Sequence, residues 1–228
     1  MPVVLVSGGA RGIGAAVASR LGSGGWDVVV ADRDPAPAGR SVICDVSAEA
    51  AVATLIDGIR ATEGSLDALI CNAGFNIRKP IADLSLAEWS SVLATNLTST
   101  FLLVRAAEPL LRAANGAVVT ISSTRAHMSE PNTEAYAASK GGLVALTHAL
   151  AISLGPDVRV NCISPGWILT KGPPPTREEH AFHSAGRVGT PEDVAALAAF
   201  LVGPDSRFIT GAEFIIDGGV TRKMIYPD

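Results

Sequence analysis

Short runs of β-branched and other apolar residues alternate along the chain with longer Ala- and Leu-rich runs. Short apolar runs predict buried strands, and the longer amphipathic runs predict helices. We predict strands at residues 3–7, 26–32, 41–46, 66–74, 117–123, 158–166 and 213–219. We predict helices at residues 12–25, 48–64, 85–116, 134–155 and 191–203.

Strands that are apolar on both faces and separated by helices indicate a parallel sheet covered on both sides. The prediction is therefore an α/β fold: a Rossmann-type, doubly wound parallel sheet of about seven strands in a three-layer α/β/α arrangement. The sequence shows no repeat and no linker, so we expect residues 1–228 to form a single dinucleotide-binding and catalytic domain.

Local signals add detail to two of these segments. Ser85 followed by Glu88 predicts a capping box at the start of helix 85–116, and Pro109 predicts a kink or break inside it. Residues 170–189 are long, polar and proline-rich, which is typical of a mobile flap over a site.

Composition mainly excludes partners. The formal charge of -4 leaves no basic face for nucleic acid or an acidic membrane. The three cysteines are far apart, which predicts buried free thiols in a reducing compartment. The N-terminus lacks a basic leader and no run approaches membrane-spanning length, so we expect a cytoplasmic protein. His180 and His183 are too loosely spaced for a metal site, and no metal is expected.

The segment "SGGARGIG" joins the first strand to the first helix, with Gly8, Gly12 and Gly14 in a G-x-x-x-G-x-G pattern. Glycines allow a sharp turn and let a pyrophosphate approach the helix N-terminus, where free N–H groups favour anions. Tight packing of a strand on a helix is the alternative explanation. Asp32 ends the second strand about 20 residues later, where an acid can bind a ribose hydroxyl and repel a 2′-phosphate.

Asp32 therefore favours NAD over NADP as the cofactor, although a helix cap or turn residue would also suit its position. Arg11 and Arg33 oppose this preference, because either could reach a phosphate. The segment "YAASK" holds Tyr136 and Lys140, which lie on one face of a helix at this spacing.

Several motifs occur together in the order found in the short-chain dehydrogenase/reductase family, which this chain resembles from about residue 3 to residue 219. They are "SGGARGIG", "CDV", "CNAG", "TNL", "ISS", "YAASK", "NCISPGWILT" and "DGG". The resemblance implies a catalytic tetrad of Asn96, Ser123, Tyr136 and Lys140. Ser122 is the neighbouring alternative to Ser123, but the thirteen-residue spacing to Tyr136 favours Ser123.

The resemblance also implies roles for these groups. Tyr136 would exchange a proton with the substrate oxygen, its phenol made more acidic by the Lys140 ammonium and a positive nicotinamide. Ser123 would polarise the substrate carbonyl, Lys140 would hold the ribose, and Asn96 would anchor a water. The implied cofactor contacts are Gly8, Arg11, Gly12, Ile13, Gly14, Asp32, Arg33, Asp45, Val46, Asn72, Ala73, Gly74, Tyr136, Lys140, Pro165, Gly166, Ile168 and Thr170. Asp45 could equally be a turn residue, Asn72 a brace for the sheet, and Asp217-Gly218-Gly219 a structural end to the last strand.

The substrate is predicted only as a small alcohol or ketone. Pocket candidates are Trp167, the flap and segment 124–135, in which His127, Glu130 and Asn132 favour a hydroxylated substrate unless they are merely solvated. An NADPH-dependent 3-oxoacyl reductase and a non-catalytic cofactor sensor are the alternatives. The family implies a homotetramer or homodimer, and residues 221–228 are expected to dock on a neighbouring subunit.

Overall fold

The computed structural model describes residues 1–224 and confirms the predicted α/β fold. Seven parallel strands form one sheet in the order β3-β2-β1-β4-β5-β6-β7. The strands are β1 (Val3–Ser7), β2 (Asp27–Asp32), β3 (Arg40–Ile43), β4 (Ala68–Cys71), β5 (Ala117–Ile121), β6 (Arg159–Pro165) and β7 (Glu213–Ile216). The chain leaves β1 toward β2 on one side and returns to β4 on the other, which creates a topological switch point beside β1.

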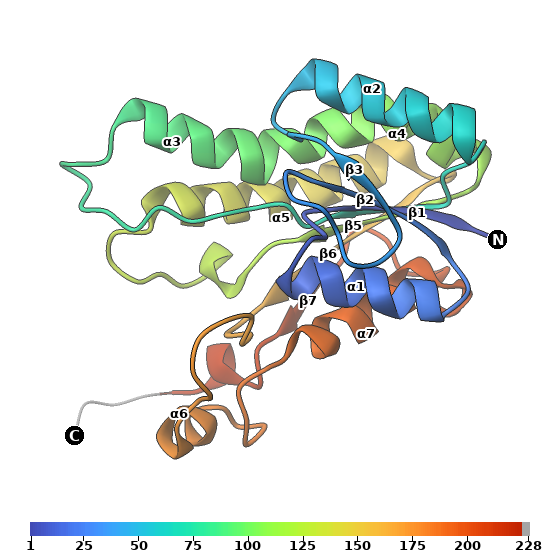
Figure 1. The fold of residues 1–228 in the computed structure, drawn as a ribbon. Helices are drawn as coiled ribbons and strands as arrows, with labels where there is room; N and C mark the ends of the chain where they lie inside the picture. Colours follow the sequence, from blue (N-terminus) through green and yellow to red (C-terminus); the bar gives the residue numbers. More distant parts are fainter. Residues whose placement is uncertain (225–228) are drawn as a thin grey trace.

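Helices cover both faces of the sheet (Figure 1). The helices are α1 (Gly12–Ser23), α2 (Glu49–Thr62), α3 (Leu86–Leu93), α4 (Ser99–Ala113), α5 (Glu134–Leu154), α6 (Arg177–Phe182) and α7 (Pro191–Val202). One core cluster joins α1 and α7 to the sheet, and a second joins α2, α4 and α5 to the opposite face. Strand residues such as Leu5 and Val30 are fully buried because both faces are covered.

Three of the strands that end earlier than predicted are followed by a polar side chain that bonds to backbone, locally at Asp45 and Asp217 and across to the glycine loop at Asn72. Asn72 follows β4 and donates from Nδ2 to the Gly8 carbonyl at 2.8 Å. Asp45 follows β3 and accepts from the Ser47 N–H at 3.0 Å. Asp217 follows β7 and accepts from Gly219 and Thr221 N–H groups, which confirms its expected structural role. Each local bond competes with continued strand pairing.

The helix predicted at 85–116 starts at the expected capping box but is irregular at an unexpected place. Ser85 and Glu88 cap α3 as predicted. The irregularity is a π-helical segment, η1 (Ala94–Thr98), whereas α4 continues through Pro109 without a break. The prediction of a break at Pro109 was therefore wrong. A π-segment inside a helix is frequently found at a functional site, and here it contains Asn96.

Helix α5 corrects a second expectation. Its 21 residues are long and apolar enough to cross a membrane by length and composition alone. Buried Ser139 and Lys140 nevertheless lie on it, and Lys140 bonds to the Ile121 carbonyl of the sheet. Its apolar composition is that of a helix packed on a protein core.

The predicted flap contains a helix that sequence reasoning missed, and it packs against the C-terminal segment of the same chain. Thr176 and Glu179 form the capping box of α6. Lys223 donates from Nζ to the Phe182 carbonyl at 2.8 Å. Lys223 thus contacts the flap of its own chain, and residues 225–228 of the predicted docking tail lie outside the described residues. The connection 33–39 has no helix, as expected.

Candidate active site

The glycine loop lies at the switch point and packs against the loop that follows β4. Gly8 has φ of +67°, and a Cβ there would be 2.7 Å from Ala73 Cα. A Cβ on Gly14 would be 2.1 Å from the Gly8 carbonyl oxygen. Asn72 donates from Nδ2 to the Ser7 and Gly8 carbonyls, so its side chain braces the loop. Both glycines are required by close packing, the alternative left open by the sequence.

The same loop also fits an anionic group. Helix α1 begins at Gly12, and its N-cap residue Arg11 makes no side-chain capping hydrogen bond. The first N–H groups of α1 are thus left for another acceptor, as a pyrophosphate requires. A Cβ on Gly12 would lie 3.3 Å from the Thr170 side chain, so the segment after β6 reaches across to the loop. Ile13, in the first turn of α1, is partly buried and packs against the core.

Asp32 ends β2 next to the glycine loop. One carboxylate oxygen accepts from the Ala10 N–H at 2.9 Å, and the other accepts from the Asp34 N–H at 3.1 Å. Arg11 lies 3.8 Å from Asp34, and both side chains are largely exposed. Arg33 is also exposed. The acid therefore holds the loop, while the two arginines lie at the solvent surface.

The remaining predicted cofactor residues differ in burial and in their contacts. Asp45 is a turn residue, and its hydrogen bonds with Ser47 lower the pKa of its carboxyl group. Val46 is buried in the core. Pro165 ends β6, and a Cβ on Gly166 would lie 2.6 Å from Asp217 Cβ. Ile168 bridges to Gly189.

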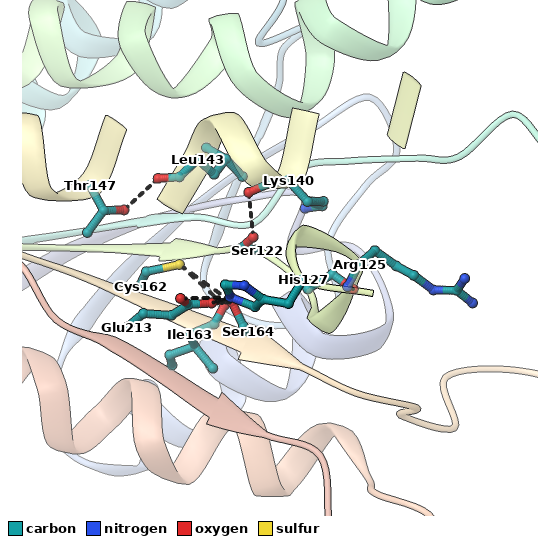
Figure 2. Close-up of polar contacts among 11 residues, drawn as sticks. Ser122, Arg125, His127, Lys140, Leu143, Thr147, Cys162, Ile163, Ser164 and Glu213 are labelled. Carbon is teal, nitrogen blue, oxygen red and sulfur yellow. Dashed lines mark hydrogen bonds and ion pairs between the residues drawn. The ribbon is translucent and has the colours of Figure 1, made fainter. Parts of the chain in front are cut away.

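Tyr136 and Ser123 meet, although they come from different elements. Ser123 caps the short helix η2 (Thr124–Ala126) after β5, and Tyr136 lies in the first turn of α5. Burial raises the pKa of the Tyr136 phenol, while a hydrogen bond with the Ser123 side chain and the charge of Arg125 act in the opposite direction. Ser122 is not the partner, because its hydroxyl donates to the Lys140 carbonyl at 2.8 Å (Figure 2).

Lys140 is buried on the same face of α5 as Tyr136. Its Nζ donates to the Ile121 carbonyl at 2.7 Å and lies 5.5 Å from the centroid of the Tyr136 ring. Burial lowers the pKa of Lys140 to about 8. The predicted acidifying effect of Lys140 on Tyr136 is not found in the protein alone, where desolvation dominates and the pKa of Tyr136 is raised.

Asn96 links three segments around this lysine. Its Oδ1 accepts from the Phe75 N–H at 2.9 Å, and its Nδ2 donates to the Phe75 carbonyl and to Ser139 Oγ. A Cβ on Gly74 would lie 3.2 Å from Asn96 Oδ1 and 3.5 Å from Lys140 Nζ, which explains the glycine there. The side chain therefore positions the loop after β4 against α5, and the expected anchoring of a water by this residue stays a prediction.

The loop after η2 is tied to the far end of the sheet by contacts that the sequence does not reveal. His127 Nε2 lies 2.7 Å from Glu213 Oε1, and Ser164 donates to the same carboxylate at 2.5 Å (Figure 2). Glu213 is 86 residues from His127 in the sequence, so no local pattern predicts their contact.

Two other predicted pocket residues are also engaged, and the loop holds one that was missed. Glu130 pairs with Arg78 and Arg125, and the Asn132 carbonyl accepts from the Lys79 N–H. Trp167 packs against His183, with ring centroids 6.0 Å apart. The sequence did not single out Arg125, although its place in the chain between Ser123 and Tyr136 was a signal that it lies near the site.

The cysteines follow the prediction, since Cys44, Cys71 and Cys162 are all free and buried. Burial raises the pKa of Cys71 to about 12, so its thiol is not a nucleophile near neutral pH.

Comparisons with known proteins agree with this arrangement. A family model described as enoyl-(acyl carrier protein) reductase matches residues 8–221. A Thermotoga maritima protein described as an uncharacterized oxidoreductase is 41% identical, over 99% of this chain and 98% of its own. D-threitol dehydrogenase of Mycolicibacterium smegmatis is 36% identical, over 97% of this chain and 93% of its own. The ligand-free aldohexose dehydrogenase of Thermoplasma acidophilum superposes with a TM-score of 0.93 at 29% identity, covering 100% of this chain and 97% of that one.

The matches span nearly the whole chain, and the family model covers the glycine loop from Gly8 on, strands β2 to β7 and the Ser123–Tyr136–Lys140 arrangement. The chain belongs to the short-chain dehydrogenase/reductase family, whose oxidoreductases use nicotinamide dinucleotide cofactors.

Proposed function

We propose that this protein is an NAD(H)-dependent dehydrogenase that interconverts a secondary alcohol and a ketone, with Tyr136 as the acid/base. One observation carries the proposal: beyond the end of β5 the Ser123 side chain lies near enough to the Tyr136 phenol to affect its pKa, and the buried Lys140 Nζ lies 5.5 Å from the centroid of the Tyr136 ring. The relatives named for D-threitol and aldohexoses support an alcohol substrate that carries further hydroxyl groups.

Each residue has a distinct task in this reaction. Tyr136 takes the hydroxyl proton of the alcohol, and Ser123 donates a hydrogen bond to the substrate oxygen. A nicotinamide cofactor, when bound, would supply the acceptor for the hydride of the alcohol carbon. Because the pKa of Tyr136 is raised in the protein alone, alcohol oxidation is expected to speed up as the pH rises. Ketone reduction uses the protonated phenol and is expected to show the opposite trend.

The proposed preference for NAD rests on Asp32. Its carboxylate lies where a ribose hydroxyl can bind and where a 2′-phosphate would meet a negative charge. Arg11 offsets this less than the sequence suggests, because it lies near Asp34 and is 84% exposed. Residues Gly8, Gly12, Gly14, Thr170 and Lys140 are proposed to hold the rest of the cofactor.

A cofactor swap tests this proposal. Oxidation of sugars, polyols and hydroxy acids is followed at 340 nm, the reduced nicotinamide band, with NAD and NADP side by side. We expect NAD to give at least tenfold higher kcat/KM, and Asp32→Ala to narrow that ratio at least tenfold. Asp57→Ala is the matched control, because it removes an exposed carboxylate on α2, away from the glycine loop. A strong NADP preference in the unmodified protein would instead support the 3-oxoacyl reductase alternative, and cofactor binding without turnover would support a sensor.

We also propose a cytoplasmic homodimer or homotetramer that buries the outer faces of α4 and α5. Phe101 on α4 is 45% exposed and Ile152 on α5 is 83% exposed, so each helix presents a large apolar side chain that a partner subunit would cover. Sedimentation analysis of the protein and of Ile152→Asp tests this, since a monomer in both cases would exclude it.

A further inference from the structure

A cluster of charged side chains near Ser123 and Tyr136 has no part in the proposed reaction. Arg125 follows Ser123 by two residues, and its guanidinium pairs with Glu130. The other Glu130 oxygen lies 3.1 Å from Arg78 Nη1. Two cations and one anion leave a net positive charge, contributed by the loop after β4, the helix η2 and the loop before α5.

The local backbone holds this cluster in place. The Arg125 N–H donates to Ser123 Oγ at 3.2 Å, so one turn sets the position of the serine and of the arginine. Thr133 Oγ1 donates to the Glu130 carbonyl at 2.7 Å and fixes the loop at the start of α5. The guanidinium is therefore positioned together with the groups that meet the substrate oxygen.

Arg125 retains donors for another acceptor. Its side chain is 25% exposed, and within residues 1–224 its ion pair with Glu130 is made through Nη2. Nε, Nη1 and the second N–H of Nη2 are left over, and that Nη2 N–H can pair with Nε or with Nη1 to bind a carboxylate or a phosphate through two parallel hydrogen bonds. Arg125 is also close enough to Tyr136 for its charge to act on the phenol. Figure 2 shows the Arg125 side chain directed away from the His127–Glu213 contact, so Glu213 does not neutralise it.

We propose that Arg125 is a specificity-determining residue that binds an anionic group of the substrate, a carboxylate or a phosphate, so that anionic alcohols are preferred over their neutral analogues. The inference rests on the proposed function, because it places the reacting hydroxyl at Ser123 and Tyr136. Glu130 orients the guanidinium, and Arg78 leaves the cluster with net positive charge.

Matched substrate pairs test the proposal with NAD as cofactor. The pairs are lactate and lactamide, 3-hydroxybutyrate and 3-hydroxybutyramide, and glycerol 3-phosphate and glycerol. We expect the anion of at least one pair to have a kcat/KM at least tenfold higher than its neutral partner. The first two pairs report on a carboxylate and the third on a phosphate.

Variants then assign the preference to Arg125. Arg125→Gln is expected to reduce the anion-to-neutral ratio at least tenfold, and Arg125→Lys to keep part of it, because the charge remains but the two-pronged geometry is lost. Glu130→Gln should raise the ratio. Arg60→Gln, an exposed arginine on α2, has the same charge change and should leave the ratio as it is.

The failure of this inference and that of the proposed function are distinguishable. Turnover of neutral alcohols without an anion preference, or a preference that survives Arg125→Gln, would overturn the role of Arg125 alone. If no alcohol is oxidised, the proposed function fails, and the same pairs are titrated calorimetrically into the protein with NAD bound. Equal affinity for anion and neutral partner would then overturn the anion site, whereas tighter anion binding that is lost in Arg125→Gln would support it.

Discussion

The proposed catalytic groups and the substrate loops of this protein are held by contacts of different kinds. Lys140 and Asn96 are almost fully buried and bond to backbone atoms of the sheet and of the loop after β4. The substrate side is held by ion pairs between partly exposed side chains, such as Arg78 with Glu130 and His127 with Glu213.

This difference has an energetic consequence. A buried group that loses its partner costs its full desolvation, about 1–3 kcal/mol, whereas an exposed ion pair contributes about 0–1 kcal/mol. Changes at the catalytic side should therefore alter both stability and chemistry. Changes at the substrate side should mainly alter substrate preference.

The largest effect is expected for Tyr136→Phe. Removing the hydroxyl removes the acid/base, so kcat/KM for alcohol oxidation should fall by about 10²–10⁴-fold. Reduced cofactor should still bind, as measured by its fluorescence, because the aromatic ring is kept. Activity that persists in the variant would remove Tyr136 from its proposed role.

Lys140→Met should show the cost of burying the lysine. Below about pH 8 the folded protein holds Lys140 as a buried ammonium. Between pH 8 and 10.5 the unfolded chain still binds this proton, whereas the folded protein has released it. The free energy of unfolding should therefore rise with pH in the unmodified protein relative to the variant, by about 3 kcal/mol across this interval. Denaturant titrations at several pH values measure the difference.

The exposed Lys171→Met serves as the control for this experiment. Parallel pH profiles for the unmodified protein and Lys140→Met would contradict a depressed pKa of Lys140.

Asn96→Ala should destabilise the junction between η1, the loop after β4 and α5. The substitution leaves the Phe75 N–H and carbonyl without their partner, and we expect the free energy of unfolding to fall by about 2–3 kcal/mol. Chemical denaturation measures this loss in Asn96→Ala and in the control variant Asn76→Ala, which changes an exposed asparagine in the loop after β4. Equal losses in the two variants would show that the bridge contributes little.

The smallest effect is expected for His127→Ala on the substrate side. The His127 side chain that contacts Glu213 is 43% exposed, so the free energy of unfolding should fall by less than about 1 kcal/mol. KM for the alcohol should rise by about two- to fivefold, because the loop that follows Ser123 loses its tie to β7. His148→Ala, an exposed histidine on α5, is the control, and a larger fall in kcat than rise in KM would place His127 nearer the chemistry.

Sequence reasoning went furthest where the required residues lie close together in the chain. Tyr136 and Lys140 are four residues apart, so helical geometry alone places them on one face. The continuous apolar strands predict a sheet buried on both sides, because an exposed face would need alternating polar residues. The Ser85–Glu88 capping box likewise depends only on neighbouring residues.

Only the tertiary structure decided what depends on distant segments and on burial. Spacing in the sequence favours Ser123 over Ser122, but the packing of α5 on β5 decides where each hydroxyl lies, Ser123 beside Tyr136 and Ser122 on the Lys140 carbonyl. The pKa of Tyr136 is raised because burial outweighs nearby charge, and burial is set by the whole fold. Glu213 meets His127 only because β7 completes the sheet. The irregular turn lies at Asn96, whose side chain bonds to Phe75 and Ser139, whereas α4 continues through Pro109.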